Sequence, residues 1–277
     1  MGSDSMENGE TALYLFCFAR SDAVREVRST AVDGHSRLVV LRPSPDLCAV
    51  VSEVAREDFC GPAEELHLQQ LDWVAPRAVR HEAVMEEVMA YSPILPLPFG
   101  TLFSSAETLA EFVDRHRETI ALFLRRVADR REWSVKGWFD RKQAQRALTS
   151  TRLAEQQKQL GALPPGTRHF AEQRIGRDIA RELSIWLDET CRTVASDLTS
   201  YASDSRECAV GPRAHLESGI DEVLNWAFLL PDSAIAPFRE QVTQANLHYQ
   251  AQGLSLQLSG PWPPFRFVPA LSSTDTP

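Results

Sequence analysis

Residues 132–140 read EWSVKGWFD, and here the period of the sequence changes from that of a helix to that of a strand. Hydrophobic residues or glycine occupy every second position, at Trp133, Val135, Gly137 and Phe139. This alternation predicts a β-strand with one buried face. Because the residues just before it repeat at helical spacing, we place a domain boundary near Arg130.

The residues after this strand predict a regular succession of elements. They are, in order, a helix over 141–160, a long helix over 168–201, strands over 207–210 and 223–230, a helix over 235–252 ended by Gly253, and a strand over 254–258 ended at Gly260. Together with the strand at 132–140, the order is strand, helix, strand, strand, helix, strand. That order is typical of the split βαβ, or ferredoxin-like, arrangement.

The residues before the boundary predict an α+β region with a less regular order. Strands are expected at 12–18, 38–41 and 47–51, and helices at 73–91 and 109–127. The two later strands form a hairpin, since the turn sequence RPSPD joins them. Residues 93–103 are apolar but contain three prolines, which excludes a helix and predicts an extended, packed segment.

Two features of these helices can be predicted in more detail. Ser105 is expected to cap the helix at 109–127, with Thr108 close behind it. In the helix at 73–91, apolar residues recur at roughly helical steps, at Val79, Val84, Val88 and Tyr91. We expect this stripe to face the core.

The sequence therefore predicts an α+β fold of two domains, which suits a length of 277 residues. A disordered leader (1–11) precedes an N-terminal α+β domain (12–130). A C-terminal ferredoxin-like domain with long helices (131–270) and a disordered tail (271–277) follow.

Composition excludes several classes of protein. The net charge is −9, the wrong sign for a nucleic-acid binder. No apolar run reaches the ~18 residues of a membrane span. The five cysteines include no CxxC pair, so we expect neither a disulfide framework nor a zinc site, with Cys17 and Cys48 buried as small hydrophobes. The expected compartment is the reducing cytoplasm.

Motifs of catalysis and cofactor binding are missing from the sequence. It contains no GxxxxGK[ST], GxGxxG or GxSxG pattern. His81-Glu82 begins like the zinc motif HExxH, but Met85 stands where the second histidine is needed. We therefore predict no enzyme activity, no cofactor and no metal. Two alternatives stay open: a small-molecule-sensing module on a ferredoxin-like fold, and a hydrolase.

Two segments rich in proline and aromatic residues stand out, at 93–103 and 260–267. They either close a core as stiff loops or form docking surfaces for another protein, and the pattern leaves both readings open. The strand at 254–258 is expected near a sheet edge, where self-association by strand pairing is possible.

Several segments resemble motifs of one known family, in the right order and over nearly the whole chain. They are His81-Glu82, ILPLPFGTLF at 94–103, EWSVK at 132–136, LNWAFLLP at 224–231 and SGPWPPFRF at 259–267. The chain resembles the GvpF/GvpL gas vesicle family in all five. It departs at Pro98, where the family carries arginine, and at Phe265, where the family carries tyrosine.

The resemblance implies a cytoplasmic protein needed to form gas vesicles. It also implies an N-terminal α+β domain and a modified ferredoxin-like C-terminal domain. Members are regarded as minor vesicle components or assembly factors that contact the small hydrophobic shell protein and other accessory proteins. The residues it nominates for packing or interaction are His81, Pro96, Phe99, Gly100, Thr101, Glu132, Trp133, Lys136, Trp262, Pro264 and Phe267.

Overall fold

The computed structural model describes residues 11–60, 67, 69–148, 164–211 and 219–271. It is a mixture of helices and sheets, which confirms the predicted α+β class. The chain divides into two compact units, Met1–Arg131 with Trp262–Pro277, and Glu132–Pro261. Residues 262–270, which the sequence placed with the C-terminal domain, group with the first unit in this division. The predicted disordered ends, apart from Thr11 and Leu271, lie outside the described residues.

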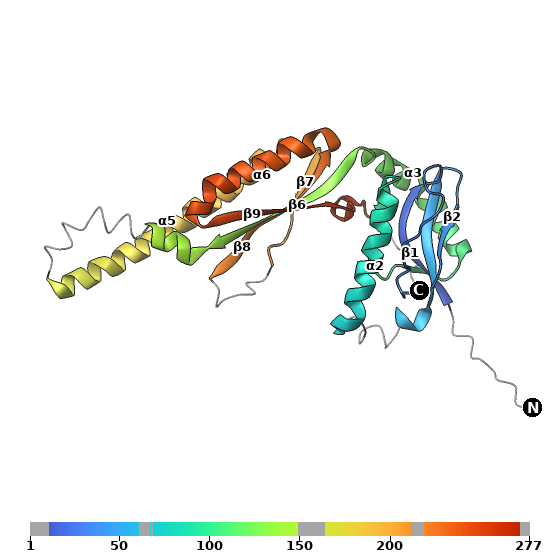
Figure 1. The fold of residues 1–277 in the computed structure, drawn as a ribbon, viewed down its shortest axis with the longest axis horizontal. Coiled ribbons are helices and arrows are strands. Elements are labelled where there is room, and N and C mark those ends of the chain that lie inside the picture. Colours follow the sequence, from blue (N-terminus) through green and yellow to red (C-terminus); the bar gives the residue numbers. More distant parts are fainter. Residues whose placement is uncertain (1–10, 61–66, 68, 149–163, 212–218, 272–277) are drawn as a thin grey trace, which may run out of the picture. The chain divides into compact units, whose positions relative to one another are not determined.

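The first unit contains an antiparallel sheet with two long helices (Figure 1). The strands are β1 (Thr11–Arg20), β2 (Leu38–Leu41), β3 (Leu47–Ala55), β4 (Ile94–Pro96) and β5 (Leu102–Phe103), in the order β2-β3-β1-β4 with β5 also paired to β1. The helices are α2 (Leu71–Met89) and α3 (Ala106–Arg126), with short 3₁₀ turns at Arg56–Asp58 and Phe265–Phe267. The predicted hairpin is confirmed as β2 and β3.

Strand β1 is central and buried on both faces. Its pairing with β3 shifts by one residue between Leu15 and Cys17. Because such a bulge moves side-chain alternation by one position, Phe16 and Cys17 both join the core that packs against α2. On α3, Phe112 stacks on Phe18 of β1 at 6.2 Å. Cys17 and Cys48 are fully buried, as predicted.

The cap of α3 agrees with the prediction, whereas the buried face of α2 agrees only in part. Ser105 caps α3 and forms a capping box with Thr108, as predicted. The predicted stripe of α2 is wrong in part, because Val79 and Tyr91 are each 66% exposed. The buried positions are His81, Val84, Met85 and Val88. These follow the i, i+3, i+4, i+7 spacing of one helix face, whereas Val79 lies outside it.

The second unit contains a four-stranded sheet in the order β7-β8-β6-β9. Its elements are β6 (Arg130–Asp140), a helix at 141–148, α5 (Pro165–Thr199), β7 (Asp204–Glu207), β8 (Ile220–Pro231), α6 (Ile235–Tyr249) and β9 (Leu254–Trp262), with 3₁₀ turns at Asp232–Ala234 and Gln250–Gln252. Helices α5 and α6 lie along the sheet (Figure 1). Their side chains share a core with it. The rest of the helix predicted at 141–160 lies outside the described residues.

Several strand boundaries in this unit differ from the prediction. The strand expected at 207–210 lies at Asp204–Glu207, paired with Trp226–Leu229 of β8. Beyond it the Cys208 N–H donates to the Asn225 carbonyl at 2.8 Å, and the Asn225 side chain donates to the Ala209 carbonyl at 2.9 Å. The strand expected at 223–230 is longer and spans Ile220–Pro231. Strand β9 continues through Pro261 to Trp262. A proline is tolerated there because β9 ends the sheet order.

Gly253, between the last 3₁₀ turn and β9, is required by both backbone angle and space. Its φ is +90°, and a Cβ at this position would lie 2.7 Å from the Asp140 carbonyl oxygen. We expect Gly253→Ala to lower the free energy of unfolding by about 2–4 kcal/mol, from left-handed strain plus this backbone clash. Chemical denaturation measures the change.

Gly100→Ala is the matched control. Its φ is +86°, but a Cβ there meets nothing within 4 Å. Gly100→Ala should lower the free energy of unfolding by only about 1–2 kcal/mol, because it adds left-handed backbone strain without a clash. Equal losses for the two variants would contradict the close approach at Gly253.

Candidate functional site: a buried histidine among the sequence motifs

His81 lies on the inner face of α2 and is 4% exposed. It meets four aromatic rings from distant parts of the first unit. Phe16 and Phe265 stack on the imidazole at centroid distances of 5.6 and 6.5 Å. Tyr14 and Phe99 meet it edge-on at 5.6 and 5.8 Å. The imidazole therefore joins β1, the 94–103 motif and the C-terminal motif in one aromatic cluster.

The polar atoms of this cluster form one continuous chain of hydrogen bonds. His81 Nε2 lies 3.2 Å from the Leu97 carbonyl, which can only accept, so Nε2 carries the proton. Nδ1 is then an acceptor, and the Tyr14 hydroxyl 2.9 Å away donates to it. The Tyr14 oxygen in turn accepts the Gly100 N–H at 3.2 Å. All three groups are satisfied with His81 neutral.

Burial favours the same neutral state. It lowers the pKa of His81 from 6.5 to about 4, and the hydrogen bond to Leu97 offsets this only in part. Burial also raises the pKa of Tyr14, so its hydroxyl keeps its proton. The pair is therefore uncharged at neutral pH and suits an apolar core.

The 94–103 motif wraps around this histidine through a tight turn. Thr101 N–H and Thr101 Oγ1 both donate to the Pro98 carbonyl, at 3.2 and 2.7 Å. Gly100 lies at the third position of the turn with φ +86°, the conformation that a type II turn requires there. Pro98 itself is exposed, so the arginine of the family would also extend outward at this position.

The structure brings together only some of the predicted site residues. His81, Phe99 and Gly100 meet directly, Thr101 closes the turn beside them, and Pro96 is buried in β4 opposite Cys17 of β1. Trp262, Pro264 and Phe267 lie in the same short segment as Phe265, with Pro264 and Phe267 buried. Both proline-rich motifs are thus buried in part, whereas Pro98 and Phe265 are exposed.

The remaining predicted residues lie on β6 in the second unit. Glu132 and Trp133 are buried there, and Gly260 of β9 approaches them closely. A Cβ on Gly260 would lie 3.0 Å from the Glu132 carbonyl and 3.1 Å from the Trp133 ring. Lys136 Nζ forms an ion pair with Glu222 Oε1 of β8 at 3.4 Å. These contacts hold neighbouring strands together.

Tyr14 and Phe16 are central to the site, and sequence reasoning missed both. They lie in TALYLFCFAR, where every ring suits a buried strand. Tyr14 is the one tyrosine in this strand, and a buried Tyr hydroxyl needs a hydrogen-bond partner. That requirement was the signal in the sequence that could have indicated a polar contact at Tyr14.

The imidazole of His81 is not available to a substrate or to a metal ion. The imidazole is covered by rings, and both its nitrogens are already hydrogen-bonded. Within the described ranges, no group of three His, Cys, Asp or Glu side chains could hold a metal ion. No helix in the same part of the chain is long and apolar enough to cross a membrane.

The outer face of α2 carries an exposed apolar row. Leu71, Ala75, Val79 and Ala83 follow one another at intervals of four residues and are all exposed. Leu71 and Val79 are 76% and 66% exposed. We call these four residues the α2 row.

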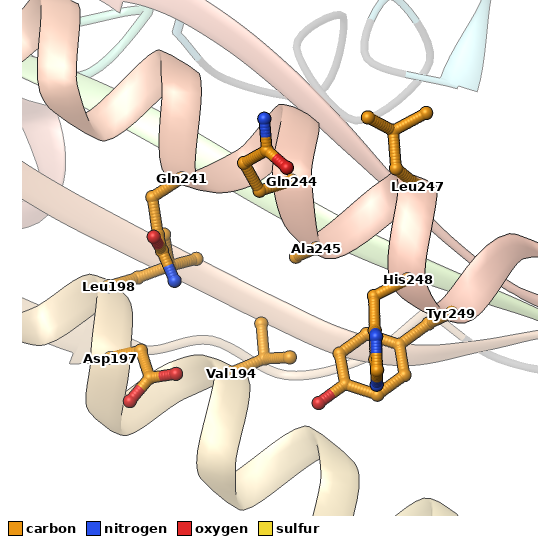
Figure 2. Close-up of a pocket in the computed structure, with 9 residues that line it drawn as sticks. All are labelled: Val194, Asp197, Leu198, Gln241, Gln244, Ala245, Leu247, His248 and Tyr249. Carbon is orange, nitrogen blue, oxygen red and sulfur yellow. The ribbon is translucent and has the colours of Figure 1, made fainter.

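A second surface feature is a groove between α5 and α6 in the second unit (Figure 2). Its volume is about 480 Å³, and Val194, Asp197 and Leu198 of α5 face residues of α6 across it. Leu247 on its rim is 70% exposed, so the groove is open to solvent. Its lining mixes apolar side chains with Gln241, Gln244 and His248.

Comparison with known proteins gives consistent matches. The chain is 26% identical over 227 residues to gas vesicle protein L of Streptomyces sp. (strain CB03234), covering 80% of each chain. Its fold matches the crystal structure of GvpF from Anabaena sp. PCC7120, with TM-score 0.66 and 20% identity over 94% of this chain and 97% of that one. GvpF from Microcystis aeruginosa matches with TM-score 0.64 and 16% identity, over 94% and 99% of the two chains. The family model described as gas vesicle synthesis protein GvpL/GvpF matches residues 12–269, and the chain belongs to this family.

Proposed function

We propose that this chain is an accessory or minor structural protein of gas vesicle assembly that acts through protein surfaces and not as an enzyme. Membership of the GvpL/GvpF family supports a role in gas vesicle assembly. In this proposal the chain works in the cytoplasm and at the gas vesicle. Its partners are the small apolar shell protein and other vesicle accessory proteins.

The exposed α2 row is the observation that supports the apolar shell protein as the partner. The two proline-rich motifs bury many of their apolar residues, and Phe265, which is exposed, is only 38% exposed. The α2 row instead exposes two large aliphatic side chains on one helix face. Exposed apolar patches on folded proteins commonly mark interaction sites. A helix face of this kind fits an apolar partner such as an unassembled shell subunit.

We also propose that the second unit is a modified ferredoxin-like domain. The order of its elements, strand, two helices, strand, strand, helix, strand, supports this assignment, since only the added helix at 141–148 departs from the ferredoxin-like order, and so does the strand order β7-β8-β6-β9. The fold by itself assigns no activity to this unit.

Co-purification with the shell protein tests the proposed partner. We expect the double variant Leu71→Asp with Val79→Asp to bind the shell protein at least about a hundredfold more weakly than the wild type, and so to recover much less of it. Burial of each aliphatic side chain contributes about 1.5–3 kcal/mol, and the double variant loses two of them. Unchanged recovery by a folded double variant would rule out the α2 row as the contact.

Ile185→Asp is the matched control for this experiment. Ile185 is 51% exposed on α5, so the substitution adds one negative charge, half of that in the double variant, at another exposed aliphatic position. It should leave recovery unchanged. Loss of recovery in both variants would indicate a nonspecific effect of added charge.

The small-molecule-sensing alternative makes a different prediction. The groove between α5 and α6 has the volume of a small-ligand site, although it is open. Sensing requires that one metabolite of a panel raise the melting temperature selectively. Shell-protein binding without such a shift favours the assembly role.

A further inference from the structure

The first six residues of β9 lack the usual protection of an edge strand against strand addition, although Pro261 lies near the end of the strand. Strand β9 ends the sheet order, and β6 is its one strand neighbour among the described residues. Its first six residues, LSLQLS at 254–259, contain no charged residue and no proline. Natural edge strands commonly carry such residues because an open edge recruits further strands. Something else must protect this edge.

The side chain of Asn246 on α6 occupies the edge at Leu256. Its Oδ1 accepts the Leu256 N–H at 2.6 Å, and its Nδ2 donates to the Leu256 carbonyl at 2.8 Å. A neighbouring antiparallel strand would make the same two bonds, because a hydrogen-bonded residue pair exchanges both N–H···O contacts. The carboxamide of Asn246 therefore takes the place of a strand.

The direction of the Leu256 groups agrees with this interpretation. The Gly253 carbonyl accepts the N–H of Asp140 on β6, so Gly253 faces the sheet. Backbone groups alternate sides along a strand, and Leu256 is three positions further on. Its N–H and C=O therefore point away from β6, toward the side where a further strand would add.

We propose that Asn246 is a cap that closes the β9 edge, and that the strand this edge fits is β9 of a second copy of this chain. The proposal is independent of shell-protein binding. Asn246 then sets the self-association of the protein, because a second copy must displace its carboxamide before the two edges can pair.

The register of β9 favours a second copy over another partner. A two-fold axis at Leu256 pairs Leu256 with itself as a hydrogen-bonded pair and sets Ser255 opposite Gln257. All leucines then lie on one face, and no like charges oppose each other. The other edge strand, β7, carries the charged residues Asp204, Arg206 and Glu207. It therefore offers no uncharged register in which it could pair with β7 of a second copy. The cap thus covers the centre of the self-complementary register.

Sedimentation of the full-length chain over a concentration series tests the cap. We expect Asn246→Ala to self-associate at least about tenfold more tightly than the wild type, because it frees both Leu256 groups for a second copy. Gln244→Ala, at an exposed position on the same helix, should behave as the wild type.

Charged residues on β9 test whether the new contact is strand pairing. Ser255 and Gln257 are both exposed, so Ser255→Lys with Gln257→Lys should leave the fold intact. Added to Asn246→Ala, the lysines face each other across the two-fold axis and should abolish the dimer. Mixing this protein with the corresponding double glutamate variant should restore a mixed dimer.

Two results would overturn the proposal. One is a folded Asn246→Ala protein that associates no more tightly than the wild type. The other is a dimer that the lysines on β9 do not weaken. If Asn246→Ala does not fold, Asn246→Gln, whose longer side chain displaces the amide from Leu256, is measured against the same outcomes.

Discussion

Replacement of His81 with alanine is expected to lower the free energy of unfolding by about 3–5 kcal/mol. The substitution removes a buried ring from contact with Phe16 and Phe265 and leaves a cavity. It also leaves the Tyr14 hydroxyl and the Leu97 carbonyl without their shared partner. Urea denaturation followed by tryptophan fluorescence measures the loss.

His248→Ala provides the control for this result. His248 is an exposed histidine near the end of α6, so its truncation should change stability by less than about 0.5 kcal/mol. A loss below about 1 kcal/mol for His81→Ala would contradict the proposed role of the imidazole as the centre of the core.

Acid is expected to destabilise the protein through the same histidine, between pH 6.5 and pH 4. The folded protein binds a proton at His81 only near its lowered pKa of about 4, whereas the unfolded chain binds it near 6.5. The unfolded state therefore holds more protons in this window, and stability falls as pH falls. The contribution is complete above pH 6.5 and amounts to about 3 kcal/mol.

Stability measured against pH in the wild type and in His81→Gln isolates this contribution. Carboxyl groups with lowered pKa, such as Glu87 held by Ser29 and Arg28, add acid sensitivity to both proteins and cancel in the difference. The variant should lose the slope between pH 6.5 and pH 4 that belongs to His81. Parallel curves for the two proteins over that range would show that His81 is not buried in its neutral form.

The histidine cluster gives the sequence motifs a physical interpretation. ILPLPFGTLF and SGPWPPFRF lie far apart in the chain, yet Phe99 of one and Phe265 of the other both pack on His81. Their apolar residues hold the first unit together. We therefore expect partner contacts on exposed faces such as the α2 row, whose four residues lie in none of the family motifs.

Local sequence predicted the elements of the fold well. The alternation in EWSVKGWFD predicted β6, and the capping residue Ser105 predicted the start of α3. Burial of the two faces of α2 was harder to predict, since Val79 looks as apolar as Val84. Which valine faces the core depends on how the whole helix packs on β1, and the local period does not contain that information.

The site was predictable only in part. The resemblance nominated His81, Phe99 and Gly100, which do meet, but neither it nor the periodicity indicated Tyr14, which lies 67 positions before His81. Their hydrogen bond depends on the packing of β1 against the inward face of α2. These two elements are distant in the chain.

The sequence by itself determined the types and order of most helices and strands, though not of β4 and β5, as well as the turns and the family resemblance. Each of these depends on residues close together in the chain, through side-chain period, proline and glycine geometry and capping. Only the tertiary structure decided that His81 is a neutral, doubly bonded core residue and that Asn246 covers the edge at Leu256. Those contacts join distant segments, and their geometry exists only once the sheets and helices have packed.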